Sequence, residues 1–379
     1  MPRRGENIRK RKDGRWECRC IVGRTPEGKT LYKSLYGRSY TEVKEKRKRN
    51  SSTEPQKAEV IFSLQGIPVK MICAEWLEEI RIQVKPSTYG QYLNKVHTHI
   101  LPYFQLMGAN QLTCATVNAF ARYLFDHGRM DEAGGLSAKT VYDIVLLVLQ
   151  IVEFGERKQY IDKFDYNGIC LPKIQKKQVL VLSTADENKL VSYCLAHADQ
   201  DTLGILVARY TGIRLGELCA LTWRDIDFEA GKMYITKTLQ RIKDTDPNKK
   251  RKTKIVIDTP KSECSVRAIH IPAFVLDILK QCRGQQDLDC YVLSDTRKYV
   301  EPRLYQKRYA KVLESAGVTY ANVHVLRHTF ATKAIELGFD IKALSEILGH
   351  ASVRFTLERY VHSSDEMKKK YMEKQVACC

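Results

Sequence analysis

The sequence lacks the features that mark several large classes of protein. It has no run of about eighteen apolar residues, and the charged N-terminal stretch MPRRGENIRKRK is not followed by an apolar segment. We therefore expect neither a membrane span nor a secretory signal, and no membrane partner. The 12 cysteines are scattered without paired CxxC units, which argues against a zinc site and against a disulfide framework. Together these absences predict a cytoplasmic protein with reduced thiols.

Motifs that hold nucleotides or catalytic metals are missing as well. The chain has no GxxxxGKS phosphate loop and no DxD-type cluster of carboxylates. Nothing in the sequence thus indicates ATP binding or a two-metal site. We expect no cofactor and no bound metal.

Acidic residues are too few to balance the basic ones. The 379 residues include 63 Lys and Arg against 44 Asp and Glu, a net charge of +19. The imbalance is steepest in residues 1–50, which hold 17 basic and 6 acidic residues. Such an excess predicts a polyanionic partner and binding that weakens with salt. The candidates for nucleic-acid contact in this part are Arg9, Lys10, Arg11, Lys12, Arg15, Arg19 and Lys33.

Local patterns divide the chain into three segments. In residues 1–58, polar and apolar side chains alternate on both sides of the turn TPEGK, which predicts a β-hairpin followed by a short helix over 41–49. Residues 65–170 carry four amphipathic helix patterns and predict a helical bundle. Residues 178–379 mix helix patterns with three strand patterns. We predict a multidomain α+β protein with a small β-sheet and helix module, a helical bundle, and a mainly α domain.

The third segment places its strand patterns between two groups of helices. Strands are expected over 232–242, 254–261 and 265–272, in a small three-stranded antiparallel sheet with the basic loop KDTDPNKKRKT between the first two strands. The first helix is expected to open with a capping box from Thr184 to Glu187.

Two pairs of polar residues in this segment have helical spacing. TGIRLGEL places Arg214 at a helix start with Glu217 three residues on, and HVLRHTF spaces His324 and Arg327 in the same way. Residues three apart share one face of a helix. Each pair also has a plain structural explanation, since an arginine and a glutamate at this spacing often form only a surface ion pair.

Three further residues with functional side chains follow these pairs in the sequence. Lys261 lies at a turn between two strand patterns, His350 follows a helix-ending glycine in ILGH, and Tyr360 ends TLERY. Taken singly they have ordinary explanations: a solvated lysine, a buried histidine, and a tyrosine that packs its ring on a core. The order of the whole set is what favours a catalytic interpretation.

The ordered set resembles the tyrosine recombinase, or phage integrase, family. The catalytic pattern of that family is Arg, Lys, His-x-x-Arg, His or Trp, and then Tyr about ten residues later. Flanking stretches TWRDIDF, HVLRHTFAT, LGH and YVH are also similar. The first two segments resemble the arm-binding and core-binding domains of the family, and the N-terminal module looks most like that of integrases from conjugative transposons. The six matching positions are Arg214, Lys261, His324, Arg327, His350 and Tyr360.

The chemistry of phosphodiester cleavage suits these residue types. Arg214 and Arg327 are expected to clamp the phosphate, because guanidinium groups donate in a planar fork and stay charged. Lys261, desolvated beside other cations, is the candidate general acid for the leaving 5′ oxygen. Tyr360 is the expected nucleophile, and we expect the surrounding cations to favour its phenolate despite an ordinary pKa near 10.

The remaining site residues are expected to support this reaction. His324 would assist proton transfer at the tyrosine or bind the phosphate, and His350 would donate to a phosphate oxygen. Glu217 would orient Arg214 from outside the phosphate site, because a carboxylate facing the phosphate would repel it. His328 and His362 flank the site but fit no position of the pattern, so no role is assigned to them.

The resemblance implies a site-specific DNA recombinase that integrates and excises a mobile element through a 3′-phosphotyrosyl intermediate. Its expected partner is double-stranded DNA at core and arm sites, on which four protomers assemble as a homotetramer. A tail helix in residues 365–375 would pack on a neighbouring protomer or on its own chain; whether an accessory excision factor takes part is left open. Further DNA contacts are expected from Lys85, Lys95, Lys249, Lys250, Arg251 and Lys252.

Two alternatives share part of this evidence. A type IB topoisomerase uses nearly the same residues but relaxes supercoils without pairing two duplexes, and the separate basic N-terminal module argues against it. A non-catalytic DNA-binding protein would explain the charge but not the complete set of six residues.

Overall fold

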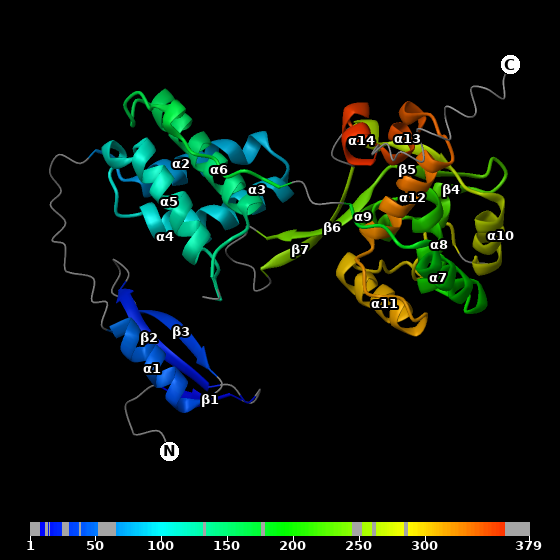
Figure 1. The fold of residues 1–379 in the computed structure, drawn as a ribbon, viewed down its shortest axis with the longest axis horizontal. Coiled ribbons are helices and arrows are strands. Elements are labelled where there is room, and N and C mark those ends of the chain that lie inside the picture. Colours follow the sequence, from blue (N-terminus) through cyan, green and yellow to red (C-terminus); the bar gives the residue numbers. More distant parts are fainter. Residues whose placement is uncertain are drawn as a thin grey trace. The chain divides into compact units, whose positions relative to one another are not determined.

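The structure is a computed structural model in which the chain forms two compact units, Met1–Gln65 and Gly66–Cys379 (Figure 1). None of the helices in the described part of the chain is long and apolar enough to cross a membrane. The described residues are 8–11, 14, 16–24, 30–37, 39–51, 66–131, 134–175, 179–244, 252–259, 263–283 and 287–360.

The N-terminal unit is a three-stranded antiparallel sheet covered by one helix. The strands lie in the order β1 (Ile8–Lys10), β2 (Trp16–Arg24) and β3 (Thr30–Gly37), and α1 (Tyr40–Ser51) packs on them. Alternation puts one face of the sheet against the helix. The small core consists of Ile8, Cys18, Leu35 and Val43. The hairpin and helix predicted for this segment are confirmed.

The second unit begins with a helical bundle in residues 66–170. Side chains at the predicted helix starts accept backbone hydrogen bonds: Thr113 caps α5 and Ser137 caps α6. Long apolar faces of these helices enclose one core that includes Phe104, Phe120 and Ile144. The helices are α2 (Val69–Gln83), α3 (Pro86–Lys95), a π-helical turn (Val96–Ile100), α4 (Leu101–Phe104), α5 (Cys114–His127) and α6 (Ala138–Arg157).

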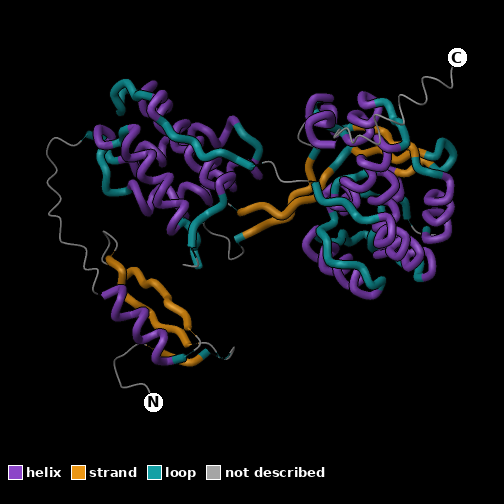
Figure 2. The backbone as a smooth tube through the Cα atoms, in the orientation of Figure 1, coloured by secondary structure: helices purple, strands orange, loops and turns teal. Residues whose placement is uncertain are grey.

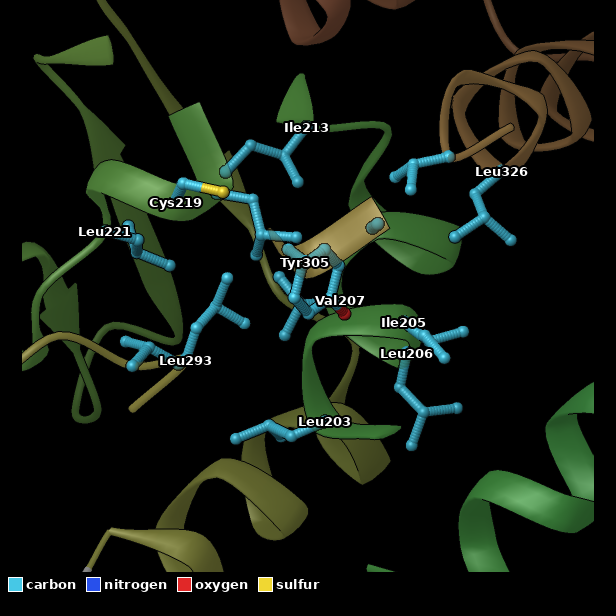
Figure 3. Close-up of a cluster of buried hydrophobic side chains, with 14 of the residues drawn as sticks. Leu203, Ile205, Leu206, Val207, Ile213, Cys219, Leu221, Leu293, Tyr305 and Leu326 are labelled. Carbon is cyan, nitrogen blue, oxygen red and sulfur yellow. The ribbon is translucent and has the colours of Figure 1, made fainter. Parts of the chain in front are cut away.

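The C-terminal part of the second unit is built around α8, which is almost entirely buried. Figure 3 shows Leu203 and Val207 of α8 in one apolar cluster with Tyr305 of α11. The hydroxyl of Tyr305 donates to the carbonyl oxygen of Asp201 at 2.8 Å, which satisfies it at the edge of this core. The helices are α7 (Thr184–Ala196), α8 (Gln200–Thr211), α9 (Leu215–Ala220), α10 (Ala273–Cys282), α11 (Pro302–Ser315), α12 (His324–Glu336), α13 (Ile341–Leu348) and α14 (Val353–Tyr360).

The strands of this part form two separate sheets (Figure 2). One is the antiparallel sheet β4 (Ile226–Asp227), β5 (Lys232–Ile235) and β8 (Arg267–His270). The other is the hairpin of β6 (Thr238–Lys243) and β7 (Thr253–Asp258). The three-stranded sheet exists as predicted, but its strands differ from the three predicted ones.

The predicted strand over 232–242 is wrong because it is two strands. Between β5 and β6, the side chain of Lys237 leaves the strand path and its Nζ lies 2.9 Å from Asp225 and donates to Thr222 at 3.0 Å. This anchor redirects the chain into a different sheet. Apolar residues keep the same two-residue period on both sides of the break, at Met233, Ile235 and Leu239, so the sequence pattern alone gives no sign of it.

Two helix predictions also need correction. The cap of α7 is Ser183, whose hydroxyl accepts from the backbone N–H of Asp186, so the predicted box from Thr184 to Glu187 is shifted by one residue. Glu187 instead turns inward and pairs with Arg209. The helix α14 that ends at Tyr360 was not predicted, and the predicted tail helix lies outside the described residues.

Candidate active site

The first part of the site is the junction between α8 and α9. Gly212 ends α8 with φ of +64°, a left-handed conformation that favours glycine. This turn makes Arg214 the residue that precedes α9, where its backbone N–H donates to Glu217 at 3.0 Å and its Nη1 donates to the same carboxylate at 2.8 Å. The carboxylate of Glu217 therefore holds both the backbone and the side chain of Arg214.

A second arginine, absent from the sequence prediction, shares this carboxylate. Arg267 on β8 donates from Nη2 and Nη1 to Glu217 at 2.9 and 3.2 Å, and from Nε to the carbonyl of Ile347 at 2.6 Å. Its side chain is 6% exposed, against 33% for Arg214. Burial raises the pKa of Glu217, but Arg267 and then Arg214 outweigh it, so the net pKa is lowered and the carboxylate stays ionised.

Arg327 brings a further cation to the same place from α12. It is 5% exposed and donates to the carbonyls of Gly212 at 2.6 Å and Leu348 at 2.7 Å. Arg214 donates from Nη2 to the next carbonyl, that of Gly349, at 2.7 Å. The two guanidinium groups thus converge on consecutive carbonyls at the C-terminus of α13, where the helix dipole favours cations.

The positive charges of these arginines are not fully balanced by negative charge in the site. Burial, followed by the charge of Arg214, lowers the pKa of Arg327 to about 9. Among the described residues, the hydrogen-bond partners of Arg327 are neutral: two carbonyls, the ring of His350 and the hydroxyl of Tyr360. An anion bound between Arg214 and Arg327 would relieve their repulsion, so the arrangement suits a phosphate.

His350 lies between this cation pair and α14. The helix α13 ends at Gly349 with φ of +62°, and the next residue turns its ring so that Nε2 lies 3.0 Å from Nη2 of Arg327 and Nδ1 lies 2.7 Å from Oγ1 of Thr356. Arginine only donates, so Nε2 is the acceptor and Nδ1 carries the proton. Burial and then the nearby arginines lower the pKa of His350 to about 3.

This tautomer does not allow the predicted role of His350, donation from Nε2 to a phosphate oxygen, in the resting arrangement. In the arrangement described, Nε2 has no proton to give, so donation to a phosphate requires Arg327 to turn from the imidazole to the anion and the ring to exchange its tautomer. Thr356, fully buried on α14, fixes the resting tautomer.

Tyr360 ends α14 with its ring stacked on that of His350 at an interplanar angle of 5° and a centroid distance of 6.2 Å. It is 6% exposed, and its hydroxyl lies 2.8 Å from Nδ1 of His328. Burial raises the pKa of Tyr360, and the opposing effects of Arg327 and Arg359 do not cancel it. The expected net preference for the phenolate is therefore not met in this state, because desolvation outweighs the cations.

His324 opens α12 and is exposed, one turn before Arg327. Partial desolvation, then the charges of Arg327, Arg214 and Arg359, lower its pKa. It is therefore a neutral imidazole at the mouth of the site at physiological pH.

A cavity of about 520 Å³ opens beside these residues. Its lining includes Arg214 and His350 on one side and Asp258 and Thr259 at the end of β7 on another. Lys261 follows β7 by three residues and lies outside the described residues. Thr259, which lines the cavity, is thus two residues before Lys261 in the sequence.

The predicted DNA-contacting residues are only partly described. Arg9, Lys10 and Arg11 are exposed, and Arg9 donates from Nε and Nη2 to the buried carboxylate of Glu17 at 3.1 and 3.0 Å. Lys85 and Lys95 are half-buried, with Nζ of Lys85 lying 3.5 Å from the carbonyl oxygen of Thr259, and Lys252 is exposed. The side chains of Arg19 and Lys33 are not described, and outside the described residues lie Lys12, Arg15, Lys249, Lys250, Arg251 and His362.

An arginine pair on a helix end, flanked by a histidine and a buried tyrosine, has a chemistry that suits attack on a phosphodiester, and it lies within a mainly helical domain. Comparison with known proteins gives the family. The model of the phage integrase family matches residues 173–367, more than half of the chain, and that of its N-terminal SAM-like domain matches residues 69–125. The chain belongs to the phage integrase family and is a tyrosine recombinase.

Similar proteins include the tyrosine recombinase XerC-like protein of Caldanaerobacter subterraneus subsp. tengcongensis, 26% identical over 93% of each chain. The ICEBs1 integrase of Bacillus subtilis is 22% identical over 79% of this chain and 80% of the relative. These likenesses, with the family match, confirm the resemblance drawn from the sequence.

Solved structures share the fold. The Tn1549 transposon integrase in complex with a circular intermediate DNA has a TM-score of 0.64 at 20% identity, over 82% of this chain and 99% of that chain. A lambda integrase tetramer bound to a Holliday junction has a TM-score of 0.55 at 16% identity, over 95% and 98%. The multidomain α+β architecture is thereby confirmed.

Proposed function

We propose that this recombinase cuts and rejoins DNA with Tyr360 as nucleophile, and that it is the integrase of a mobile element. The observation that carries this proposal is the convergence of Arg214 and Arg327 on neighbouring carbonyls beside His350 and Tyr360. A scissile phosphate exchanges readily with those carbonyls, because a charged acceptor binds a guanidinium more strongly than a neutral one.

The reaction begins when the phosphate replaces the resting partners of the two arginines. The oxygen of Tyr360 attacks phosphorus, and the bond from phosphorus to the 5′ oxygen breaks as the bond to the tyrosine forms. Lys261 gives its proton to the departing 5′ oxygen, and the neutral imidazole of His324 accepts the proton of the phenol. Arg214 and Arg327 stabilise the charge that develops on the non-bridging oxygens.

The covalent product retains the energy of the bond that was broken. A free 5′ hydroxyl of a second strand can attack the 3′-phosphotyrosyl bond, release the phenol of Tyr360 and reseal the backbone without a nucleotide cofactor. Each chemical step is thus reversible, and the order of strand exchange decides the outcome.

Assembly and partners are the finer part of the proposal. The basic N-terminal unit would hold arm sites, and residues 66–170 with the catalytic part would hold a core site. Four protomers would act on the paired sites in the cytoplasm, with the tail helix of residues 365–375 as a contact between them. The tetrameric lambda integrase of similar fold supports this arrangement.

A nicked duplex that carries the core site tests the chemistry. Wild type should trap a covalent adduct resistant to denaturation, because the short strand beyond the cut diffuses away. Tyr360→Phe should form none, whereas Tyr320→Phe, at an exposed tyrosine of the same domain, should react like wild type. An adduct formed by Tyr360→Phe, or none by wild type, would contradict the proposal.

The same preparation separates the recombinase from a topoisomerase. Two duplexes with core sites should exchange strands, whereas a topoisomerase would only relax a supercoiled circle. Footprints of the full chain and of a chain lacking residues 1–60 should differ by loss of protection at the arm sites alone.

A further inference from the structure

A histidine outside the recombinase pattern contacts the proposed nucleophile. His328 follows Arg327 on α12, and its Nδ1 lies 2.8 Å from the hydroxyl of Tyr360. The two rings are 5.6 Å apart at an interplanar angle of 51°, so the contact is edgewise through the polar atoms. The other ring nitrogen, Nε2, lies 3.4 Å from Nη2 of Arg359, the residue before the nucleophile. One imidazole therefore spans the phenol and the neighbouring cation.

These two partners decide which ring nitrogen carries the proton. A guanidinium has only donors, and a neutral imidazole has one N–H and one lone pair. A lone pair on Nε2 attracts Arg359, whereas an N–H at that position would face another N–H. The proton therefore lies on Nδ1, which makes His328 a donor toward the oxygen of Tyr360.

The surroundings of His328 keep it neutral. The titratable and charged groups that face it are Arg359 from α14, and His324 and Arg327 from its own helix. Burial, followed by these groups, lowers the pKa of His328 to about 4. At pH 7 the ring thus offers a single N–H and adds no charge to a site already rich in arginine.

The oxygen of Tyr360 is approached by donors from several side chains. Arg327 and Arg359 each lower the pKa of Tyr360 against the stronger effect of burial. Donors aimed at one oxygen stabilise an anion there more than a neutral hydroxyl. The N–H of His328 acts in the same direction as the two cations.

We propose that His328 is a further catalytic residue: its Nδ1–H donates to the oxygen of Tyr360, fixes the position of the nucleophile and stabilises the phenolate that attacks phosphorus. This inference rests on the proposed role of Tyr360. The proton of the phenol goes to His324, because Nδ1 of His328 already carries one. The leaving 5′ oxygen, which lies opposite the attacking oxygen at phosphorus, takes its proton from the proposed general acid Lys261.

The test compares His328→Ala with His328→Asn in single-turnover cleavage of the nicked duplex between pH 6 and 9.5. The amide N–H of asparagine can take the place of Nδ1–H, but an amide does not titrate. We expect the alanine variant to cleave about 100-fold more slowly at pH 7. Its cleavage rate should keep increasing up to a higher pH than the rate of wild type does. The asparagine variant should stay within about tenfold of wild type.

Two controls exclude a loss of structure. His270→Ala, at an exposed histidine on β8, should leave cleavage unchanged. Thermal unfolding and binding to uncut duplex should show that both His328 variants are folded and occupied by DNA. Tyr360→Phe tests the nucleophile separately, because an adduct formed by that variant contradicts the proposed function without involving His328.

A second substrate locates the effect on the nucleophile side. With sulfur in place of the bridging 5′ oxygen, the leaving group needs no proton, so Lys261→Ala should regain cleavage while His328→Ala stays slow. Three results would overturn the proposal: cleavage by His328→Ala at the wild-type rate, equal defects in the alanine and asparagine variants, or recovery of His328→Ala with the sulfur substrate.

Discussion

The helical bundle of residues 66–170 and the catalytic part of residues 179–360 differ in how many polar side chains they bury. Among the described residues, the bundle buries one polar side chain, that of Ser87. Burying a charge without full compensation costs several kcal/mol, so each buried charge of the catalytic part needs either a partner or a function. The catalytic part buries Glu187, Thr202, Arg209, Thr211, Glu217, Thr222, Ser265, Arg327, Thr329, Ser345 and Thr356.

Burial of charge alone does not identify a site, as two arginines of the catalytic part show. Arg209 pairs with the carboxylate of Glu187, while Nε of Arg209 and Oε2 of Glu187 find no other partner in the described structure. Arg327 instead bonds neutral groups and faces Arg214. The first arrangement neutralises its charge and the second keeps it available to a ligand.

The largest expected effect comes from breaking the second arrangement. Arg327→Lys keeps the charge but loses the planar fork, so cleavage of the nicked duplex should fall by about 1,000-fold. The free energy of unfolding should also fall by about 2 to 4 kcal/mol, because the carbonyls of Gly212 and Leu348 lose their donor. Arg308→Lys, in a partly exposed ion pair with Asp201, is the matched control and should change neither by much. Cleavage above a tenth of the wild-type rate would argue against the clamp.

The next effect compares two buried carboxylates. Glu217→Gln should lower the free energy of unfolding by about 3 kcal/mol and slow cleavage more than tenfold per folded molecule, because Arg214 loses its orientation. Glu187→Gln should cost similar stability without slowing the folded enzyme. Denaturant unfolding and single-turnover rates measure both, and equal catalytic defects would contradict the distinction.

The ion pairs of Glu217 also make the free energy of unfolding depend on pH. Its pKa is lowered in the folded protein, so its ion pairs contribute fully above the unfolded pKa of about 4.3 and are lost as the pH falls toward the folded value. In the variant Glu217→Gln, stability should therefore fall less steeply between pH 5 and 3 than in wild type.

Two histidines should also make the stability of the folded protein fall in acid, at a higher pH than Glu217 does. The folded-state pKa values of His328 and His350 are lowered to about 4 and about 3. The unfolded chain takes up protons near pH 6.5 that the folded site does not, so stability should fall by about 2 kcal/mol for each histidine from pH 7 to pH 5. The double substitution of both histidines by asparagine should flatten this slope. An unchanged slope would mean that neither ring is buried in its neutral form.

A smaller effect is expected at Thr356. Thr356→Val keeps the shape but removes the acceptor of the His350 Nδ1–H, so the tautomer is no longer fixed. Cleavage should slow by about three- to tenfold, with nearly unchanged DNA binding. Thr329→Val, whose hydroxyl bonds the carbonyl of Val325 on α12, controls for the loss of a buried hydroxyl.

The smallest effect belongs to the bundle. The hydroxyl of Ser87 is buried without a hydrogen-bond partner among the described residues, so Ser87→Ala should change the free energy of unfolding by less than about 0.5 kcal/mol, or raise it slightly. Cleavage should be unchanged. A loss above about 2 kcal/mol would show that this side chain has a partner in solution.

Local signals explain how much the sequence could predict. Glycine after an apolar helix pattern marked the end of α13 at Gly349, because glycine readily adopts the left-handed conformation that closes a helix. The order of the six pattern residues indicated the family and the fold class. Their convergence remained a prediction from resemblance, and Lys261 stays one.

Long-range partners could not be predicted in this way. Arg267 meets Glu217 across fifty positions, and His328 meets Tyr360 across thirty-two. Neither spacing belongs to a helix or strand period. The break at Lys237 was hidden for a similar reason, since its partner Asp225 belongs to a different element. Such contacts depend on how elements pack, and a single sequence does not record that.

The two carbonyls that hold the arginine pair belong to successive residues, Leu348 and Gly349, so one peptide unit sets the spacing of both cations. Successive Cα atoms lie about 3.8 Å apart. A slide or rotation of the last turn of α13 would therefore displace the resting positions of both guanidinium groups together. A partner that binds α13 would thus act on both arginines of the resting site at once, before the phosphate replaces their carbonyl partners.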